Sequence, residues 1–495
     1  MLLCADWVLP ISSPPLPEGA LLVSEGVIRA VGPVAELRAR YPTEETRGFP
    51  GCALLPGLVN AHTHLEYSAF RGFARPSGFG PWMLNLLRAR RRLGTEDYVA
   101  SALWGAYECA RSGVTSIADT SYDGWPVARA ARSVGLRARV YLELFGVDDA
   151  RLPATMERLE EDIERLRGER GETLGAGEAY PGPSPAPSGP GSGGPRMEYG
   201  VSPHAPYTVS ARLYREAARF ARRAGLRMAT HVAESRAEVR LLMRGGGPIA
   251  HAYRAVGLWK GSRWSPPRVS PVRYLDGTGA LGSDMLAVHA VQVSGEDIAV
   301  LAGAGAVVAH CPRSNLKLRC GRAPVAEMLA AGAVVGLGTD SLASNDSLDM
   351  FAEMRAALAV SKERAAAAGA LTEAGSTAST PTPLTAADVL RMATLDGARA
   401  LGWERLVGSL EVGRRADIIA VRLGDGAAVP QPHARPQGPR ITVDDPTETF
   451  VRSATADDVR MTMIDGRVVS EGDAPPPHVL AGLNAARERL SLPPI

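Results

Sequence analysis

Residues 54–66 read Leu-Leu-Pro-Gly-Leu-Val-Asn-Ala-His-Thr-His-Leu-Glu, and this stretch decides the fold. An apolar run ends abruptly in two histidines, His62 and His64. Residues two apart in a strand point to the same face of its sheet. The stretch therefore predicts a buried strand that presents two imidazoles at its end, an arrangement suited to binding a metal ion.

Polar groups that could complete such a site end other apolar runs far along the chain. His231 follows one such run and is itself followed by Glu234, which gives a His-x-x-Glu motif. His289, His310 and Asp340 each end a further run. A (β/α)8 barrel carries its active-site residues at the carboxyl ends of its strands. The repeated placement therefore predicts that these groups meet at one end of a barrel.

The number of apolar runs in the middle of the chain agrees with this fold. With the strand before His62 there are eight, the others covering 114–119, 138–144, 197–201, 228–232, 285–290, 306–310 and 334–339. The segments between them are rich in Ala, Arg, Leu and Glu, which favour helices. Alternating strands and helices predict an α/β fold with a parallel sheet, here a TIM-like (β/α)8 barrel.

Both ends of the chain read instead as short strands and turns. The Asp465-Gly466 step lies between two apolar alternations, which is a strong hairpin signal. We expect one small β domain built from both termini, residues 1–55 and 404–475. It would enclose a barrel at 56–403 and be followed by a C-terminal tail at 476–495.

Three stretches interrupt these patterns. Residues 168–196 are dense in Gly, Pro and Ser, which predicts a flexible surface insertion without a fold of its own. Residues 365–383 resemble it in composition, and residues 427–441 form a Pro-rich loop within the β domain.

Composition excludes several classes of function. The net charge of +2 gives no electrostatic case for binding nucleic acid or an anionic membrane. The five cysteines form no Cys-x-x-Cys pair, which argues for a reducing compartment. Neither a signal peptide nor an apolar run of about 20 residues is visible. We expect a cytoplasmic protein that acts on a small molecule, and the sequence leaves a homo-oligomer open.

His62, His64, His231 and Asp340 form a ligand set suited to Zn²⁺ or Fe²⁺, with a position left open for water. A strand-end histidine pair alone could equally be structural, and the two further ligands favour the metal. Binuclear sites of this kind often use a carbamylated lysine on an inner strand. The chain has three lysines and none ends an early or middle strand, which favours one metal ion.

Two further groups could handle protons. Glu234 could carry a proton from the attacking water to the substrate, as a carboxylate beside a metal can. An isolated glutamate would more often lie on the surface, but its link to His231 favours the catalytic role. His289 could orient the water or accept its proton, with a plain core histidine as the alternative. Asp340 could also pass a proton to the leaving group.

The chain resembles the amidohydrolase superfamily, in the branch of cytosine, guanine and S-adenosylhomocysteine deaminases and triazine hydrolases. The motifs that carry the resemblance are Pro-Gly-Leu-Val-Asn-Ala-His-Thr-His, the His-x-x-Glu motif, and Gly-Thr-Asp-Ser-Leu-Ala-Ser-Asn at the eighth strand. The resemblance implies one catalytic metal held by His62, His64, His231 and Asp340. It also assigns acid–base work to Glu234.

Three segments are similar to the aminodeoxyfutalosine deaminases of menaquinone biosynthesis. They are His-Thr-His-Leu-Glu, Ser270-Pro-Val-Arg-Tyr-Leu275 and His310-Cys-Pro-Arg-Ser-Asn315. The resemblance implies deamination of an adenine-type nucleoside. An S-adenosylhomocysteine or adenosine deaminase, and a triazine or cyclic-amide hydrolase, are the alternative enzymes. A homologue without activity would be expected to lack metal ligands, and none is missing.

The same resemblance suggests which residues contact the substrate. His204 lies in a Ser-Pro-His-Ala-Pro-Tyr segment similar to one that places a histidine near the nucleoside in adenosine-type deaminases. Glu66 lies at the expected mouth of the pocket. Arg313 could pair with the benzoate of a futalosine, and Ser314 and Asn315 follow it in the same motif.

Overall fold

The eight apolar runs of the middle region form one parallel sheet in the computed structural model. Its described residues are 1–73, 78–168, 196–255, 265–373, 381–423 and 446–495. Neighbouring strands pair in chain order, and a parallel bridge between Thr63 and Asp340 joins the last strand region to the first. The strands are β6 (Leu58–Thr63), β7 (Val114–Ser121), β8 (Arg137–Leu144), β9 (Met197–Pro203), β10 (Arg227–Val232), β11 (Met285–His289), β12 (Val307–His310) and β13 (Val335–Leu337). The fold is a (β/α)8 barrel, as the sequence predicts.

Burial explains why these strands read as continuous apolar runs. All residues of β6, β7, β11, β12 and β13 are buried, because helices cover the outer face and side chains fill the interior. The covering helices include α3 (Thr95–Arg111), α4 (Trp125–Val134), α5 (Leu152–Gly168), α6 (Ala211–Arg223), α9 (Pro271–Thr278), α10 (Gly295–Gly303), α12 (Val325–Ala330), α14 (Ala386–Met392) and α15 (Leu395–Leu401).

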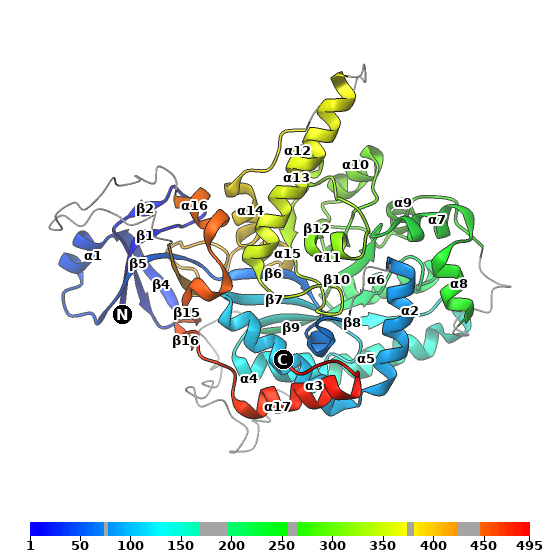
Figure 1. Cartoon of the computed structure of the whole chain (residues 1–495), viewed down its shortest axis with the longest axis horizontal. Helices are drawn as coiled ribbons and strands as arrows, with labels where there is room; N and C mark the ends of the chain where they lie inside the picture. Colours follow the sequence, from blue (N-terminus) through cyan, green and yellow to red (C-terminus); the bar gives the residue numbers. More distant parts are fainter. Residues whose placement is uncertain (74–77, 169–195, 256–264, 374–380, 424–445) are drawn as a thin grey trace.

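The composition of residues 365–383 misled the prediction of an irregular segment. Helix α13 (Met350–Glu373) continues through the first half of that stretch and projects from the barrel (Figure 1). The run of alanines at 365–368 explains the difference, because alanine is the best helix former. Residues 374–380 lie outside the described part, as do 169–195 of the expected insertion and the whole of 427–441.

Strands from both ends of the chain build a second sheet beside the barrel (Figure 1). Its strands are β1 (Leu2–Val8), β2 (Leu16–Pro17), β3 (Gly19–Ser24), β4 (Val27–Pro33), β5 (Thr46–Pro56), β14 (Ile418–Arg422), β15 (Val459–Ile464) and β16 (Arg467–Ser470). The N- and C-terminal parts join where β5 pairs antiparallel with β14. The predicted hairpin joins β15 and β16, and Asp465 and Gly466 both take positive φ, +49° and +74°.

A buried ionic cluster ties this sheet to the amino-terminal end of the barrel. Arg137, the first residue of β8, is fully buried and donates to Asp417 at 3.0 Å and to Asp465 at 2.9 Å. Arg196 and Arg415 also pair with Asp465. Since the functional groups lie at the opposite, carboxyl end of the strands, the β domain braces the barrel away from the site.

The C-terminal tail contains helix α17 (Pro477–Arg489), which packs against α3. Arg487 donates to the backbone carbonyls of Ala69 and Arg71, at 3.0 and 2.9 Å. These carbonyls belong to the segment that follows the two strand-end histidines. The tail therefore supports the loop directly after β6.

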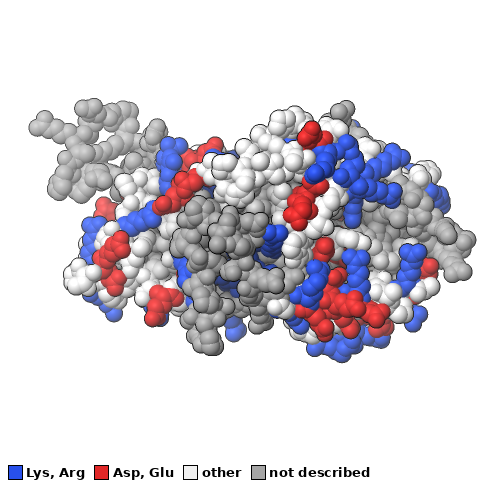
Figure 2. Space-filling model, turned by 90° about the horizontal axis from the view of Figure 1, so that it is seen from below, with Lys and Arg blue, Asp and Glu red and all other residues white. Residues whose placement is uncertain are grey.

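The surface carries mixed charge. On the face in Figure 2, basic and acidic side chains lie side by side, in keeping with the net charge of +2. Among the helices of the described ranges, none is both long enough and apolar enough to cross a membrane.

Candidate metal centre

His62 in β6 and His64 directly after this strand face the carboxylate of Asp340, which follows β13. Nε2 of His62 and Nε2 of His64 each lie 3.6 Å from Oδ1 of Asp340. The three side chains are at most 8% exposed. One ligand atom from each lies within 4.8 Å of the others, so that a single ion could contact all three.

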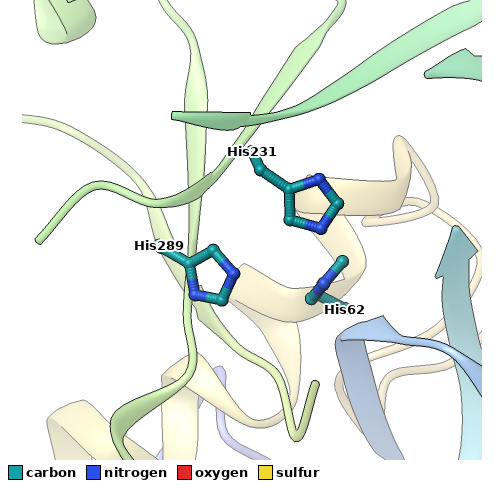
Figure 3. Close-up of side chains that lie close together, drawn as sticks. All are labelled: His62, His231 and His289. Carbon is teal, nitrogen blue, oxygen red and sulfur yellow. The ribbon is translucent and has the colours of Figure 1, made fainter. Parts of the chain in front are cut away.

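Two more histidines converge on His62 from neighbouring strands. Figure 3 shows the rings of His62, His231 and His289 pointing toward one another from β6, β10 and β11. Their ligand atoms also lie within 4.8 Å of one another. Nδ1 of His231 donates to the carbonyl of His204 at 2.9 Å, which leaves the Nε2 lone pair free for a ligand.

The donor set fits a divalent metal ion. Nε2 of His62 is buried and has no hydrogen-bond partner among the described residues. Burial lowers the pKa of His62 and of His231, and it lowers the pKa of His64 to about 4. These imidazoles are therefore neutral near pH 7, which is the form that binds a metal.

Asp340 is held in an ionised, fixed position. Burial raises its pKa, but the close approach of His62, with His289 and His64 nearby, outweighs burial and holds the pKa well below its usual range. Ser344 donates its hydroxyl at 2.7 Å, the backbone N–H of Ser341 donates at 2.7 Å, and Ser314 is also hydrogen-bonded to the carboxylate. Asp340 adopts a φ of +58°, a strained conformation that the surrounding contacts must maintain.

Gly338 explains how β13 comes so close to His62. A Cβ at this position would lie 2.8 Å from the backbone N and O of His62. Only glycine allows the two backbones to approach this closely, and the approach sets the distance between His62 and Asp340.

Glu234 and His289 lie close together beside the candidate metal ligands. Oε1 of Glu234 lies 3.8 Å from Nε2 of His289, and both side chains are buried. Nδ1 of His289 donates to Oδ1 of Asn315 at 3.0 Å, which turns its Nε2 lone pair toward Glu234. Burial, with the charges of Asp340 and Glu238, raises the pKa of Glu234 well above its usual value. Burial lowers the pKa of His289 to about 3. Burial thus favours the uncharged form of both side chains.

The residues predicted to contact the substrate do not all lie beside the candidate metal ligands. His204 lies against the candidate metal ligands, its ring centroid 4.9 Å from that of His231. Glu66 is buried beside β7 and accepts hydrogen bonds from the Ser121 hydroxyl and the Tyr122 N–H, at 2.8 and 3.3 Å.

The Arg313-Ser314-Asn315 segment begins helix α11 (Pro312–Lys317). Ser314 is hydrogen-bonded to Asp340, and Asn315 is hydrogen-bonded to His289, as described above. The guanidinium of Arg313 instead donates to the Ser347 hydroxyl at 2.9 Å and lies 3.6 Å from the buried carboxylate of Glu353. Arg313 is therefore already paired within the protein.

Sequence reasoning missed Glu143, the second-last residue of β8. Oε1 of Glu143 lies 4.0 Å from Nε2 of His204, and Glu143, His204 and His231 offer ligand atoms within 4.8 Å of one another. The only feature of the sequence that could have indicated Glu143 was its position as a charged residue near the end of an apolar strand. His310, assigned no role above, is buried at the end of β12, and neither ring nitrogen has a partner among the described residues.

The two described lysines lie on helices α11 and α13 and not on a strand of the barrel. Lys317 pairs with Asp346, and Lys362 is an exposed residue of α13. Lys260 lies outside the described residues.

The barrel and this cluster of histidines and carboxylates define a class of hydrolase that uses a divalent metal. The Amidohydrolase family matches residues 53–469, and the chain belongs to that family. It is an aminohydrolase-type enzyme that acts on carbon–nitrogen bonds other than peptide bonds. A second match, the bacterial imidazolonepropionase-like composite domain, covers residues 19–43 of the β domain.

Relatives of this chain carry deaminase names. A 5-methylthioadenosine/S-adenosylhomocysteine deaminase from Moorella thermoacetica is 33% identical over 463 residues, which is 93% of this chain and 92% of the relative. An adenosine deaminase from Xanthomonas campestris, solved with bound zinc, is 27% identical with a TM-score of 0.76, and the match covers 99% and 98% of the chains. An aminofutalosine deaminase from Helicobacter pylori shares the fold at 21% identity, with a TM-score of 0.72 over 95% and 100% of the chains.

Proposed function

We propose that this enzyme hydrolytically deaminates C6 of an adenine nucleoside that is modified at its 5′ position. The observation that carries the proposal is the pairing of Glu234 with His289 directly beside the cluster of metal-ligand atoms. Replacing an amino group by water requires a metal to activate the water and an acid–base group beside it. The deaminase names of relatives that span almost the whole chain support the same reaction.

His62, His64, His231 and Asp340 would hold one divalent metal ion, with zinc the first candidate and iron the second. The free Nε2 of His62 and the neutral state of the imidazoles support this assignment. Zinc in the Xanthomonas campestris relative supports the choice of metal. When bound, the metal supplies a water molecule that is acidic enough to act as a nucleophile near neutral pH.

Glu234 and His289 would move the protons. Glu234, whose pKa burial raises, takes one proton from the attacking water and donates it to the ring nitrogen beside C6, which makes that carbon more electrophilic. His289 orients the attacking water through its Nε2 lone pair while Asn315 fixes the ring. Asp340, held by Ser341 and Ser344, passes a proton from the water to the departing amine, so that ammonia and the 6-oxo product leave.

Two substrate classes fit this chemistry. A 5′-thioether nucleoside, such as 5′-methylthioadenosine or S-adenosylhomocysteine, is favoured by the relative at 33% identity. Aminodeoxyfutalosine is favoured by the His-Thr-His-Leu-Glu and His-Cys-Pro-Arg-Ser-Asn motifs. The pairing of Arg313 with Glu353 weakens the specific argument that Arg313 binds a benzoate. We place the thioether nucleosides first and aminodeoxyfutalosine second.

A deamination screen tests the proposal. The metal-loaded enzyme is given 5′-methylthioadenosine, S-adenosylhomocysteine, 5′-deoxyadenosine, aminodeoxyfutalosine, adenosine and a chlorotriazine. The ultraviolet shift from adenine to hypoxanthine and the release of ammonia are followed together. We expect the highest kcat/KM for a thioether nucleoside. Highest turnover of aminodeoxyfutalosine would support the second candidate, and turnover of the triazine alone would refute the proposal.

A further inference from the structure

The carboxyl-terminal rim of the barrel divides into two halves with different chemistry. The proposed proton-transfer groups lie at the ends of β10, β11 and β13: Glu234 and Asp340 follow β10 and β13, and His289 is the last residue of β11. Glu143 and His204 lie at the ends of β8 and β9, on the other side of His231. If the reacting edge of the base faces the first half, the rest of the nucleoside must extend over the second.

Glu143 is the unexplained group in that second half. Its side chain is only 4% exposed, and Oε1 has no hydrogen-bond partner among the described residues. Nε2 of His204 is 4.0 Å away, beyond hydrogen-bonding distance. A buried polar atom without a partner is rare and unfavourable, so a bound ligand that supplies a donor would relieve it.

His204 is turned so that its free nitrogen faces the same place. Its Nδ1 is bonded to the Thr208 hydroxyl at 2.9 Å, and its ring stacks on Phe145 with centroids 4.7 Å apart. These contacts fix the ring and leave Nε2 directed toward Glu143. Oε1 of Glu143 and Nε2 of His204 are therefore two fixed polar atoms 4.0 Å apart, close enough to contact the same part of a ligand.

The charges around these two atoms favour a neutral donor over a cation. Burial and the charge of Glu66 raise the pKa of Glu143, while the positive charge of Arg90 lowers it, with a net value of about 8. Arg90 thus already supplies a positive charge to this region. A second metal ion is also disfavoured, because Nδ1 of the shared ligand His231 is occupied by the His204 carbonyl.

We propose that Glu143, together with His204, binds the sugar hydroxyls of the nucleoside and makes the enzyme selective for ribonucleosides. This inference rests on the proposed function. A ribose offers two adjacent O–H donors, and a carboxyl group can accept from both. A site built to hydrogen-bond a hydroxyl strongly rejects an analogue that lacks it.

The test compares substrates with and without the hydroxyls in wild type and two variants. Glu143→Gln keeps the shape of the side chain, and Glu164→Gln, an exposed glutamate of α5, is the matched control. Kinetics are measured with adenosine and 2′,3′-dideoxyadenosine. 2′-Deoxyadenosine and 3′-deoxyadenosine then show which hydroxyl is bound. Turnover of the dideoxy substrate also reports that each variant is folded and loaded with metal.

We expect wild type to favour adenosine over the dideoxy analogue by at least about tenfold in kcat/KM, the size expected when the hydrogen bonds of both hydroxyls are lost. Glu143→Gln should lose at least about tenfold on adenosine, mainly through KM, and keep its rate on the dideoxy analogue. Glu164→Gln should match wild type. The inference alone would be overturned if Glu143→Gln lost kcat/KM equally on both substrates. It would also be overturned if wild type had the same kcat/KM with and without the hydroxyls. A wild type inactive on every adenine nucleoside would overturn the proposed function as well.

Discussion

Glu143→Gln should make the folded enzyme more stable at alkaline pH, because the folded state raises the pKa of this carboxyl from an ordinary 4.5 to about 8. Between those two pH values the unfolded chain has lost the proton and the folded chain retains it. The folded state then binds more protons, so the carboxyl lowers the free energy of unfolding progressively as pH rises through this window. Glutamine has no proton to lose, and it removes the effect.

The magnitude follows from about 1.4 kcal/mol for each pH unit between the folded and unfolded pKa values. The stabilisation by Glu143→Gln should approach about 4 kcal/mol at pH 8 and fall to about 1 kcal/mol at pH 5. The value at pH 8 is a ceiling, because glutamine introduces an amide N–H₂ that also needs partners.

Urea unfolding of the metal-loaded protein at pH 5 and pH 8, followed by circular dichroism, measures the difference. Glu164→Gln, with an exposed side chain, should follow wild type at both pH values. A Glu143→Gln variant less stable than wild type at pH 8, or equally stabilised at both pH values, would refute the reasoning.

Four further outcomes are expected. Elemental analysis should find about one zinc or iron ion per chain, and two ions would contradict a single site. Glu234→Gln should keep metal and fold and lose at least about 10²-fold in kcat, and a near-normal rate with full metal would make Glu234 structural. Arg137→Ala leaves two buried aspartates without their main partner and should cost about 3 kcal/mol in urea unfolding; unchanged stability would show that the cluster is not needed. Gly338→Ala should displace His62 and weaken metal binding at least about tenfold by competition with a chelator, while Gly369→Ala, which has open space around it, should not.

The strand-end groups were predictable because periodicity determines where they lie. His62 and His64 share a face by their spacing, and Asp340 ends a run of buried-type residues, so a parallel barrel has to bring them to one rim. The eight strands were found within a few residues of their bounds for the same reason. The assignment of these side chains as ligands stays a prediction until metal is measured.

Contacts between distant side chains were not predictable. Arg313 looked free for an anionic substrate, but a buried glutamate forty residues later, on α13, lies beside it. Glu143 sits in a plain Leu-Glu-Leu strand sequence without a motif, and only the barrel shows that it lies beside His204. The helical half of residues 365–383 was missed because low-complexity composition was weighted above the helix propensity of alanine.

The pairing of β5 with β14 also sets an order of events during synthesis. Pro56 pairs with Ile418, and the buried residues Leu54 and Leu55 lie in the same part of β5. This side of β5 therefore has no partner strand until the ribosome has made the whole barrel. Contacts so distant in sequence form slowly, and an uncovered apolar strand edge is prone to aggregation. Nascent chains that stop before residue 418 should therefore depend on chaperones. The sheet whose first strands are made at the start of synthesis is completed only by the last strands of the chain.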